Sequence, residues 1–460
     1  MNKNKKNWTL IGIITIMLFI FLLGYMQVNK NRNKEPEADK IENFVNPEEE
    51  ILGTDGEKID DVSSGEAENG ALSGDKTSNE NSSENASSDD GSAPLVPGDV
   101  SNSESAEGVI EEAGDKEADA QEKYIDFVMN SMSLHEKVCQ MILPSFATLS
   151  GVKGAKISGD ITKKALEDYP VSGIIYDSSN FETEEQTKQM LDDVKQYTKI
   201  PLILTLDEEG GRVARLMPKF TDALIGPMFM YKSQGTETAY NNAAIIAGNI
   251  SKYGFNMDMA PVADVWSNSA NTVIGDRAYS DDYDEAAELV SAAVSGFHGG
   301  KIACTLKHFP GHGDTLEDSH YGAAYVGKTL DELRSGEFIP FKAGIDAGAD
   351  AVMIGHLIVS DISEEPALFS KEIVTDILRG ELGFEGVVIT DSLQMKAMTD
   401  YYGEDEVAVR AIEAGCDILL MPNDIGVTAG AIEKAVSDGR LSEERINESV
   451  RRILRLKYSF

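Results

Sequence analysis

The chain has few cysteines, with only Cys139, Cys304 and Cys416 in 460 residues. An odd number of widely separated cysteines provides neither a disulfide framework nor a zinc motif. Each lies in an apolar stretch, so we expect three buried thiols. Three unpaired cysteines are compatible with an exported protein but do not by themselves establish export.

Residues 35–120 lack arginine altogether and have almost no aromatic residues. They contain 26 Asp or Glu and four Lys, and Phe44 is their only aromatic residue. Such a segment repels itself and has too little apolar surface to offset chain entropy, so we predict a disordered acidic linker. A tail that binds cations or a partner is the alternative. With a formal net charge of −38, we expect no electrostatic binding to nucleic acid or anionic lipid.

Charge is also absent from the 21 residues Trp8–Val28, which are rich in Ile, Leu, Phe and Met. About 20 apolar residues suffice to cross a bilayer. We predict that residues 1–34 form a single-pass membrane anchor, with residues 8–28 spanning and the remaining chain outside the cell. The alternative is a cleaved signal peptide and a secreted protein, but the run ends without the small residues of a cleavage site. No cysteine follows the run, which excludes a lipoprotein-type attachment.

From residue 121 to 460 the composition is that of a globular domain. Short apolar runs rich in β-branched residues alternate with helical patterns, which predicts an α/β fold, a (β/α)₈ barrel in one domain. The predicted strands are Val138–Leu143, Gly173–Tyr176, Leu202–Leu206, Asn256–Ala260, Ala303–Leu306, Ala351–Ile354, Val387–Thr390 and Ile418–Met421. The predicted helices include Glu184–Tyr197, Glu285–Phe297, Leu330–Ala347 and an amphipathic final helix, Ser442–Leu456.

Polar residues follow several of these runs, where a barrel of this class places its active site. They are Asp207, Arg277, Lys307, His308, His356 and Asp391. Asp391 directly follows G-V-V-I-T, so a nucleophile, a metal ligand or a helix N-cap is plausible there. Asp207 opens D-E-E-G-G-R-V-A-R, which suits a clamp for several hydroxyls, as on a sugar, or a surface salt-bridge cluster.

The segment Leu306–His320, L-K-H-F-P-G-H-G-D-T-L-E-D-S-H, carries three of the six histidines. Its Pro and Gly residues favour a shaped loop over a helix or central strand. Asp318 and His320 can lie side by side on an extended loop, where the carboxylate would make the imidazole a better base. The alternative is a purely structural hydrogen bond within the loop. A metal site is an alternative whose spacing matches no compact motif; its ligands would be His308, His312, Asp314, Asp318 and His320.

Together these segments resemble the β-N-acetylglucosaminidases of glycoside hydrolase family 3. The resemblance runs from about Met132 to the C-terminus through six motifs in the family's order. They are MSLHEKVCQM, LDEEGGRVARL, GFNMDMAPVADV, IGDRAYS, KHFPGHGDTLEDSH and GVVITDSLQMKAM. KHFPGHG followed by D-S-H is typical of the acetylglucosaminidase branch.

The resemblance implies a retaining mechanism in which Asp391 attacks the anomeric carbon, His320 is the acid and base, and Asp318 orients His320. It also implies no cofactor and no metal. The sugar and its acetamido group would be held by Asp207, Arg215, Arg277, Lys307 and His308. His312 receives no assigned role.

Two positions differ from the family. Tyr321-Gly322-Ala323-Ala324 replaces the usual Leu-Pro after D-S-H, and Glu208 replaces a glutamine, which should be tolerated if its side chain points away from ligand. The expected protein is a membrane-anchored, monomeric exo-enzyme acting on peptidoglycan fragments with a terminal N-acetylglucosamine. The alternatives are a phosphorylase, with phosphate as acceptor, and a non-catalytic cell-wall-binding protein on the same fold.

Overall fold

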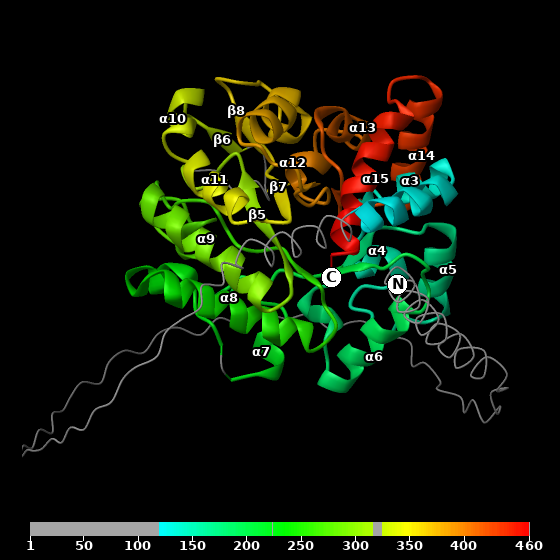
Figure 1. Cartoon of the computed structure of the whole chain (residues 1–460), viewed down its shortest axis with the longest axis horizontal. Coiled ribbons are helices and arrows are strands. Elements are labelled where there is room, and N and C mark those ends of the chain that lie inside the picture. Colours follow the sequence, from blue (N-terminus) through cyan, green and yellow to red (C-terminus); the bar gives the residue numbers. More distant parts are fainter. Residues whose placement is uncertain (1–118, 223, 316–323, 460) are drawn as a thin grey trace, which may run out of the picture. The chain divides into compact units, whose positions relative to one another are not determined.

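The computed structural model describes residues 119–222, 224–315 and 324–459, which form a ring of parallel strands surrounded by helices (Figure 1). Eight strands match the eight predicted runs, so the predicted (β/α)₈ barrel is confirmed. They are β1 (Ile142–Leu143), β2 (Gly173–Ile175), β3 (Ile203–Thr205), β4 (Met257–Asp258), β5 (Ala303–Phe309), β7 (Ala351–Ile354), β9 (Val387–Thr390) and β10 (Leu419–Leu420).

The ring is closed by parallel pairing of the first strand with the last, in which Ile142 lies opposite Leu419. Ladders join β2 to β3 and run through β4, β5, β7 and β9. Backbone hydrogen bonds of 3.0 Å connect the remaining neighbours, for example from Met259 N to Leu206 O and from Thr390 N to Ile418 O. All residues of these strands are buried, which explains why most of these strands appear in the sequence as apolar runs.

Helices connect consecutive strands and cover the outside of the ring. The α-helices are α3 (Leu134–Cys139), α4 (Phe146–Ser150), α5 (Asp160–Asp168), α6 (Glu184–Lys195), α7 (Met217–Phe220), α8 (Gly235–Ser251), α9 (Tyr283–Gly299), α10 (Leu330–Arg334), α11 (Phe338–Asp346), α12 (Lys396–Thr399), α13 (Glu404–Ala414), α14 (Ile425–Ser437) and α15 (Glu443–Lys457). Helices of other types are η1 (Ser178–Asn180), η2 (Met228–Gln234), η3 (Gly275–Arg277), η4 (Ala367–Phe369) and the π-helix η5 (Glu372–Glu381). Residues 119–131 are also helical.

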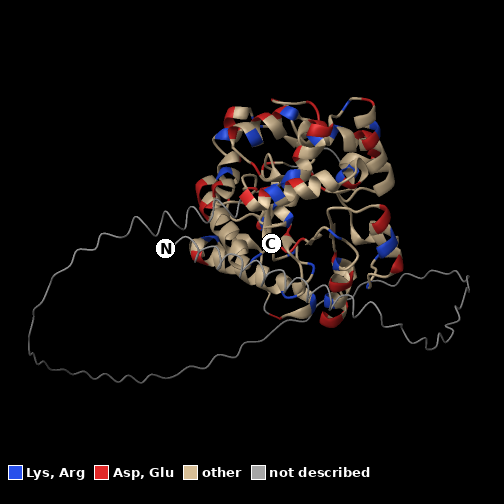
Figure 2. Cartoon of the chain, turned by 45° about the vertical axis from the view of Figure 1, so that its right-hand side comes forward, with Lys and Arg blue, Asp and Glu red and all other residues tan. Residues whose placement is uncertain are grey.

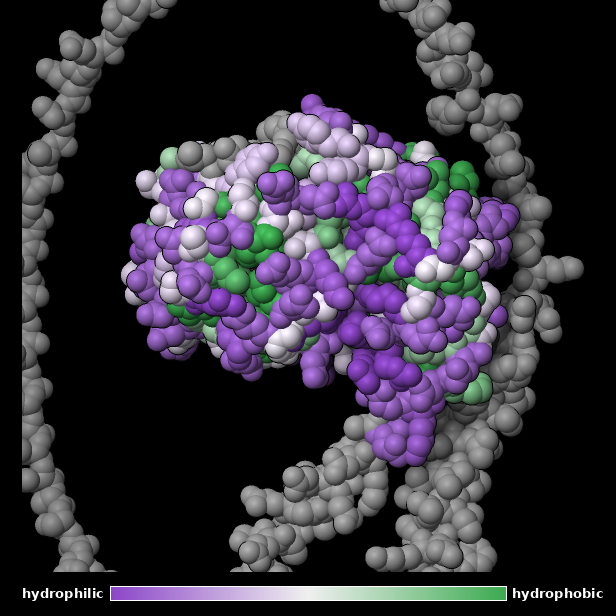
Figure 3. Space-filling model, turned by 90° about the horizontal axis from the view of Figure 1, so that it is seen from above, coloured by the Kyte–Doolittle hydropathy of each residue, from purple (hydrophilic) through white to green (hydrophobic). Residues whose placement is uncertain are grey.

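The final helix is amphipathic, as predicted. Ser442 caps α15 by accepting a hydrogen bond from Arg445 N, and the helix buries Ile446, Val450, Ile453 and Leu454. Both acidic and basic residues are distributed over the outer helices in Figure 2. The face in Figure 3 is hydrophilic over most of its area, with apolar residues scattered across it.

Two predicted elements of the barrel differ in the structure. The run Val138–Leu143 is only partly strand, because a capping box between Ser133 and Glu136 begins α3, which continues through Cys139. The predicted helix Leu330–Ala347 is two helices, α10 and α11. They separate near Gly336, where a Cβ atom would lie 3.0 Å from the ring of Tyr283.

Two further strands, β6 (Ala324–Val326) and β8 (Leu357–Val359), pair in parallel and were not predicted. Each is only three residues long and lies outside the ring ladders. The segment Leu306–His320 also begins as strand rather than loop, because β5 continues to Phe309 before Pro310 ends it.

All three cysteines are free and buried, as predicted. Burial raises the pKa of Cys139 and of Cys416 to about 12. The predicted membrane span, residues 8–28, and the predicted acidic linker, residues 35–120, lie outside the described residues, except for positions 119 and 120. Within residues 119–222, 224–315 and 324–459, no helix has the length and apolar composition needed to cross a membrane.

Candidate active site

A cavity of about 530 Å³ opens where the strands of the ring end. Asp207 follows β3, Lys307 and His308 belong to the last part of β5, and Asp391 follows β9. These residues line the cavity together with Arg215 and Arg277. The barrel therefore brings together all six predicted site residues that the structure describes.

Asp318 and His320, the predicted acid and base pair, lie within residues 316–323, outside the described residues. Their placement stays a prediction.

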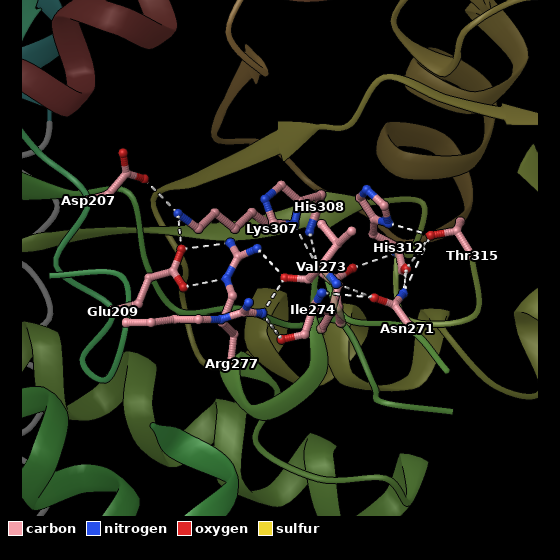
Figure 4. A network of polar contacts seen from close by, with 12 residues as sticks. Asp207, Glu209, Asn271, Val273, Ile274, Arg277, Lys307, His308, His312 and Thr315 are labelled. Atoms are coloured by element: carbon pink, nitrogen blue, oxygen red, sulfur yellow. Dashed lines mark hydrogen bonds and ion pairs between the residues drawn. The ribbon is translucent and has the colours of Figure 1, made fainter. Parts of the chain in front are cut away.

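A buried charge network forms one wall of the cavity (Figure 4). Lys307 Nζ lies 2.8 Å from Asp207 Oδ1 and 2.6 Å from Glu209 Oε1. Arg277 donates two hydrogen bonds of 2.8 Å to the two oxygens of Glu209, one from Nε and one from Nη2. Arg215 Nη2 lies 3.9 Å from Asp207 Oδ2. Glu209 therefore holds both buried cations in fixed positions beside Asp207.

The network keeps Glu209 and Lys307 charged. Burial works against ionisation of Glu209, but Arg277 and Lys307 outweigh it and hold the pKa of Glu209 below its usual range. Burial likewise works against the charged form of Lys307, whose pKa is nevertheless raised by the carboxylates of Asp207 and Glu209. An ordered set of charged donors and acceptors of this kind suits a ligand with several hydroxyl groups.

The turn after β3 is shaped by glycine and by Glu208. Gly211 has a φ of 57°, and a Cβ atom there would lie 2.7 Å from Pro227 Cα, so no larger residue fits without a shift. Glu208 accepts hydrogen bonds from the backbone N–H groups of Arg215, Leu216 and Met217. Its side chain is thus used inside the protein and does not line the cavity, as expected for a tolerated replacement.

Arg277 is positioned by the loop that precedes it. Asn271 Oδ1 accepts hydrogen bonds from Val273 N and Ile274 N, both at 2.9 Å. Arg212 Nη2 donates to the carbonyl groups of Val273 at 2.6 Å and Ile274 at 3.0 Å. Arg212 is therefore committed to this loop, and only Arg215 of the two arginines after β3 lines the cavity.

Asp391 is not a helix N-cap. The next helix, α12, begins five residues later, and its N-cap is Met395. Asp391 Oδ1 instead accepts a hydrogen bond of 2.6 Å from Ser392 N, while Asp391 N donates to Ile354 O at 2.9 Å. The N-cap alternative is therefore wrong. Asp391 is a carboxylate held at the end of a buried strand, beside the cavity.

The other histidines near the site have structural contacts. His312 is buried, and its Nδ1 lies 2.7 Å from Thr315 Oγ1. Its pKa is lowered mainly by burial and, to a smaller extent, by the neighbouring His308. His356 Nε2 lies 2.8 Å from Ser392 O, next to Asp391. Neither histidine lines the cavity.

The described members of the alternative metal set do not form a metal centre. His308 Nδ1 lies 2.6 Å from Asp264 Oδ2, and His312 Nδ1 is paired with Thr315. The one group of three side chains in the described ranges with the right atoms close together, within 4.8 Å, is His298, Cys304 and Asp350. It lies where β5 and β7 begin, Asp350 already accepts hydrogen bonds within it, and burial raises the pKa of the Cys304 thiol well above its usual value.

Residues 133–456 match the family model described as the glycosyl hydrolase family 3 N terminal domain. The chain belongs to glycosyl hydrolase family 3. It is 37% identical over 278 residues to a protein of Stenotrophomonas maltophilia (strain K279a) named beta-hexosaminidase, a match that covers 59% of this chain and 82% of the relative. A glycoside hydrolase family is therefore established on sequence and fold together.

Solved structures are similar to this chain in sequence and fold. The family 3 beta-N-acetylglucosaminidase of Paenibacillus sp. str. FPU-7 is 36% identical with a TM-score of 0.67, over 71% of this chain and 62% of that one. The structure titled M tuberculosis LpqI is 28% identical with a TM-score of 0.64, over 72% of this chain and 95% of that one.

Sequence reasoning missed two buried carboxylates, Glu209 and Asp264. Glu209 follows Asp207 and Glu208 in an acidic run that looks like a solvated surface turn, yet its side chain is only 4% exposed. Asp264 ends the sequence A-P-V-A-D after β4 and is fully buried. For Asp264 the signal was an acidic residue directly beyond an apolar run, the same signal that singled out Asp391, whereas Glu209 lies two residues further on and had no such signal.

Proposed function

We propose that the chain is a retaining exo-β-N-acetylglucosaminidase that removes terminal N-acetylglucosamine from peptidoglycan fragments or related glycans. The observation that carries the proposal is the convergence of Asp391 with the charge network of Asp207, Arg277 and Lys307 in one cavity. Two relatives support the sugar, because one is named a beta-hexosaminidase and the other a beta-N-acetylglucosaminidase.

In this proposal Asp391 attacks the anomeric carbon and forms a covalent glycosyl-enzyme. His320 protonates the departing oxygen and then takes a proton from the attacking water, and Asp318 orients its ring and stabilises its charged form. Asp207, Arg215, Arg277, Lys307 and His308 hold the hydroxyls and the acetamido group. None of these steps calls for a metal or an organic cofactor.

The stereochemistry of hydrolysis tests the mechanism. Proton NMR of the purified full chain acting on a 4-nitrophenyl N-acetyl-β-glucosaminide should show the β-anomer of N-acetylglucosamine as the first product. Initial release of the α-anomer would refute the double displacement, and absence of turnover would refute the substrate. Formation of a sugar 1-phosphate when phosphate is added would show that phosphate replaces water as acceptor.

We also propose that residues 8–28 anchor the enzyme to the membrane and that the acidic segment 35–120 separates the anchor from the barrel. The support is the 21-residue uncharged run Trp8–Val28. Membrane fractionation and intact mass of the expressed full chain test this proposal. A soluble product that lacks the N-terminal residues would instead identify a cleaved signal and a secreted enzyme.

A further inference from the structure

Asp264 lies behind His308 and accepts hydrogen bonds from three N–H groups. Its Oδ2 lies 2.6 Å from His308 Nδ1 and 3.1 Å from His308 N, and its Oδ1 lies 2.7 Å from His312 N. The carboxylate has no exposed side-chain surface. It also does not line the cavity, so any effect on a ligand must pass through the histidines.

The contact with Nδ1 determines how the ring of His308 can meet a ligand. An ionised carboxylate only accepts hydrogen bonds, so Nδ1 must carry the hydrogen. In the neutral ring Nε2 then carries a lone pair and can accept a hydrogen bond from a sugar hydroxyl. The ring lines the cavity, and the structure gives Nε2 no hydrogen bond to any described residue.

The carboxylate is ionised because of its surroundings. Burial works against the charged form, but the electrostatic attraction of the His308 N–H groups and the hydrogen bond from the ring, with a further contribution from His312, outweigh it and lower the pKa of Asp264. An amide in the same place could accept fewer of the three hydrogen bonds, since its NH₂ group would face one of the N–H donors.

The segment around Asp264 also fixes the chain that leaves β5. Ala263 N, next to Asp264, donates a hydrogen bond to Lys307 O, next to His308, at 2.7 Å. Gly313 packs so closely that a Cβ atom would lie 1.6 Å from Val265 O. Residues 263–265 therefore contact the chain from Lys307 to Gly313 at several points, and Asp264 supplies the side chain in this contact.

We propose that Asp264 is a positioning residue that fixes the tautomer and orientation of His308 in the sugar-binding cavity and holds the backbone at His312. It touches neither substrate nor reacting atoms and acts through the residues it binds. Outer carboxylates of this kind orient histidines that bind metals, and here the same geometry serves a cavity for hydroxyl groups. The inference rests on the proposed function only for its kinetic readout.

The test compares Asp264→Asn with Asp417→Asn in the full chain. Asp417 is a control for the loss of a buried carboxylate, because it is also fully buried and accepts hydrogen bonds from Val388 N at 3.0 Å, Ser449 Oγ at 2.6 Å, Arg379 Nη2 at 2.6 Å and Arg452 Nη1 at 3.1 Å. It does not line the cavity. Both variants lose a buried charge, but only Asp264→Asn disturbs His308.

Two readouts separate positioning from a merely structural role. Long-range ¹H–¹⁵N spectra should show His308 with its proton on Nδ1 in the wild type and on Nε2 in Asp264→Asn, while Asp417→Asn keeps the wild-type tautomer. Per folded molecule, kcat/KM on the aryl N-acetylglucosaminide should fall about 10- to 100-fold in Asp264→Asn, as expected for one hydrogen bond to a charged group, mainly through a higher KM. Asp417→Asn should stay within about threefold of wild type.

A wild-type His308 protonated on Nε2, or Asp264→Asn with the wild-type tautomer and KM, would overturn the proposal. If Asp264→Asn does not fold, Asp264→Glu keeps the acceptor and should keep the Nδ1–H tautomer with a raised KM; loss of that tautomer or an unchanged KM would overturn the proposal. Should the wild type not hydrolyse the glycoside, the proposed function fails while the wild-type spectrum still decides the role of Asp264.

Discussion

Glu209 is the member of the charge network whose loss should have the largest effect on stability. Its side chain is 4% exposed, and it neutralises Arg277, which is 10% exposed, and Lys307, which is 2% exposed. Glu209→Gln keeps the shape and removes the charge, which leaves two buried cations with only Asp207 beside them. Removing one partner of a buried ion pair typically costs about 3–5 kcal/mol, so we expect a loss of that size in the free energy of unfolding at pH 7.

The same argument predicts how the free energy of unfolding changes with pH. Because the pKa of Glu209 is lower in the folded protein than its unfolded value near 4.5, its contribution is fully present above pH 4.5 and is lost as pH falls toward the folded-state pKa. The wild type should therefore lose stability between about pH 4.5 and the lowest pH at which it folds. Glu209→Gln lacks this contribution at pH 7 and should lose less over the same range.

Urea unfolding followed by circular dichroism measures both effects. Glu406→Gln is the matched control, since Glu406 also pairs with an arginine, Arg440, but the two side chains are 48% and 41% exposed. An exposed pair contributes about 0–1 kcal/mol. If Glu209→Gln destabilises the protein no more than Glu406→Gln does, and the pH profiles run parallel, the reasoning about the network is refuted.

Three further predictions concern the proposed chemistry and one other buried charge. Asp391→Asn should lower kcat on the order of 10⁴-fold or more with the unfolding curve little changed, measured on 4-nitrophenyl N-acetyl-β-glucosaminide; substantial residual turnover would exclude Asp391 as nucleophile. His320→Ala should lose about 10²–10⁴-fold on substrates with poor leaving groups and much less on those with very good ones, and equal losses on a series of aryl glycosides would exclude it as the acid. Lys457 is buried, and burial lowers its pKa well below 10.5, so the free energy of unfolding of the wild type should rise as pH increases toward 10.5. Lys457→Met should lack this rise, and the exposed control Lys434→Met should keep it. Parallel urea-unfolding profiles for the two variants would contradict this prediction.

The strands and their ends could be predicted because both depend on local sequence. Each strand of the ring is buried on both faces, so it appears as a short apolar run, and a polar residue just beyond the run marks the open end of the barrel. This is how Asp207, Lys307, His308 and Asp391 were identified. Arg277 lies in a long loop, and only the resemblance to family 3 assigned it to the sugar.

The pairings of the buried carboxylates could not be predicted, because their partners are distant in sequence. Glu209 pairs with Arg277 across 68 residues, and Asp264 pairs with His308 across 44. The missed features therefore share one cause: they are contacts between segments rather than properties of a segment.

Covalent trapping tests the central claim most directly. The full chain would be incubated with a 5-fluoro N-acetyl-β-glucosaminyl fluoride, whose slow deglycosylation allows the intermediate to accumulate, and then digested for peptide mass spectrometry. We predict one sugar per chain, attached to the peptide that carries Asp391, and no label on Asp391→Asn. A label on another residue, or an enzyme that turns over this substrate and never carries the sugar, would contradict the account.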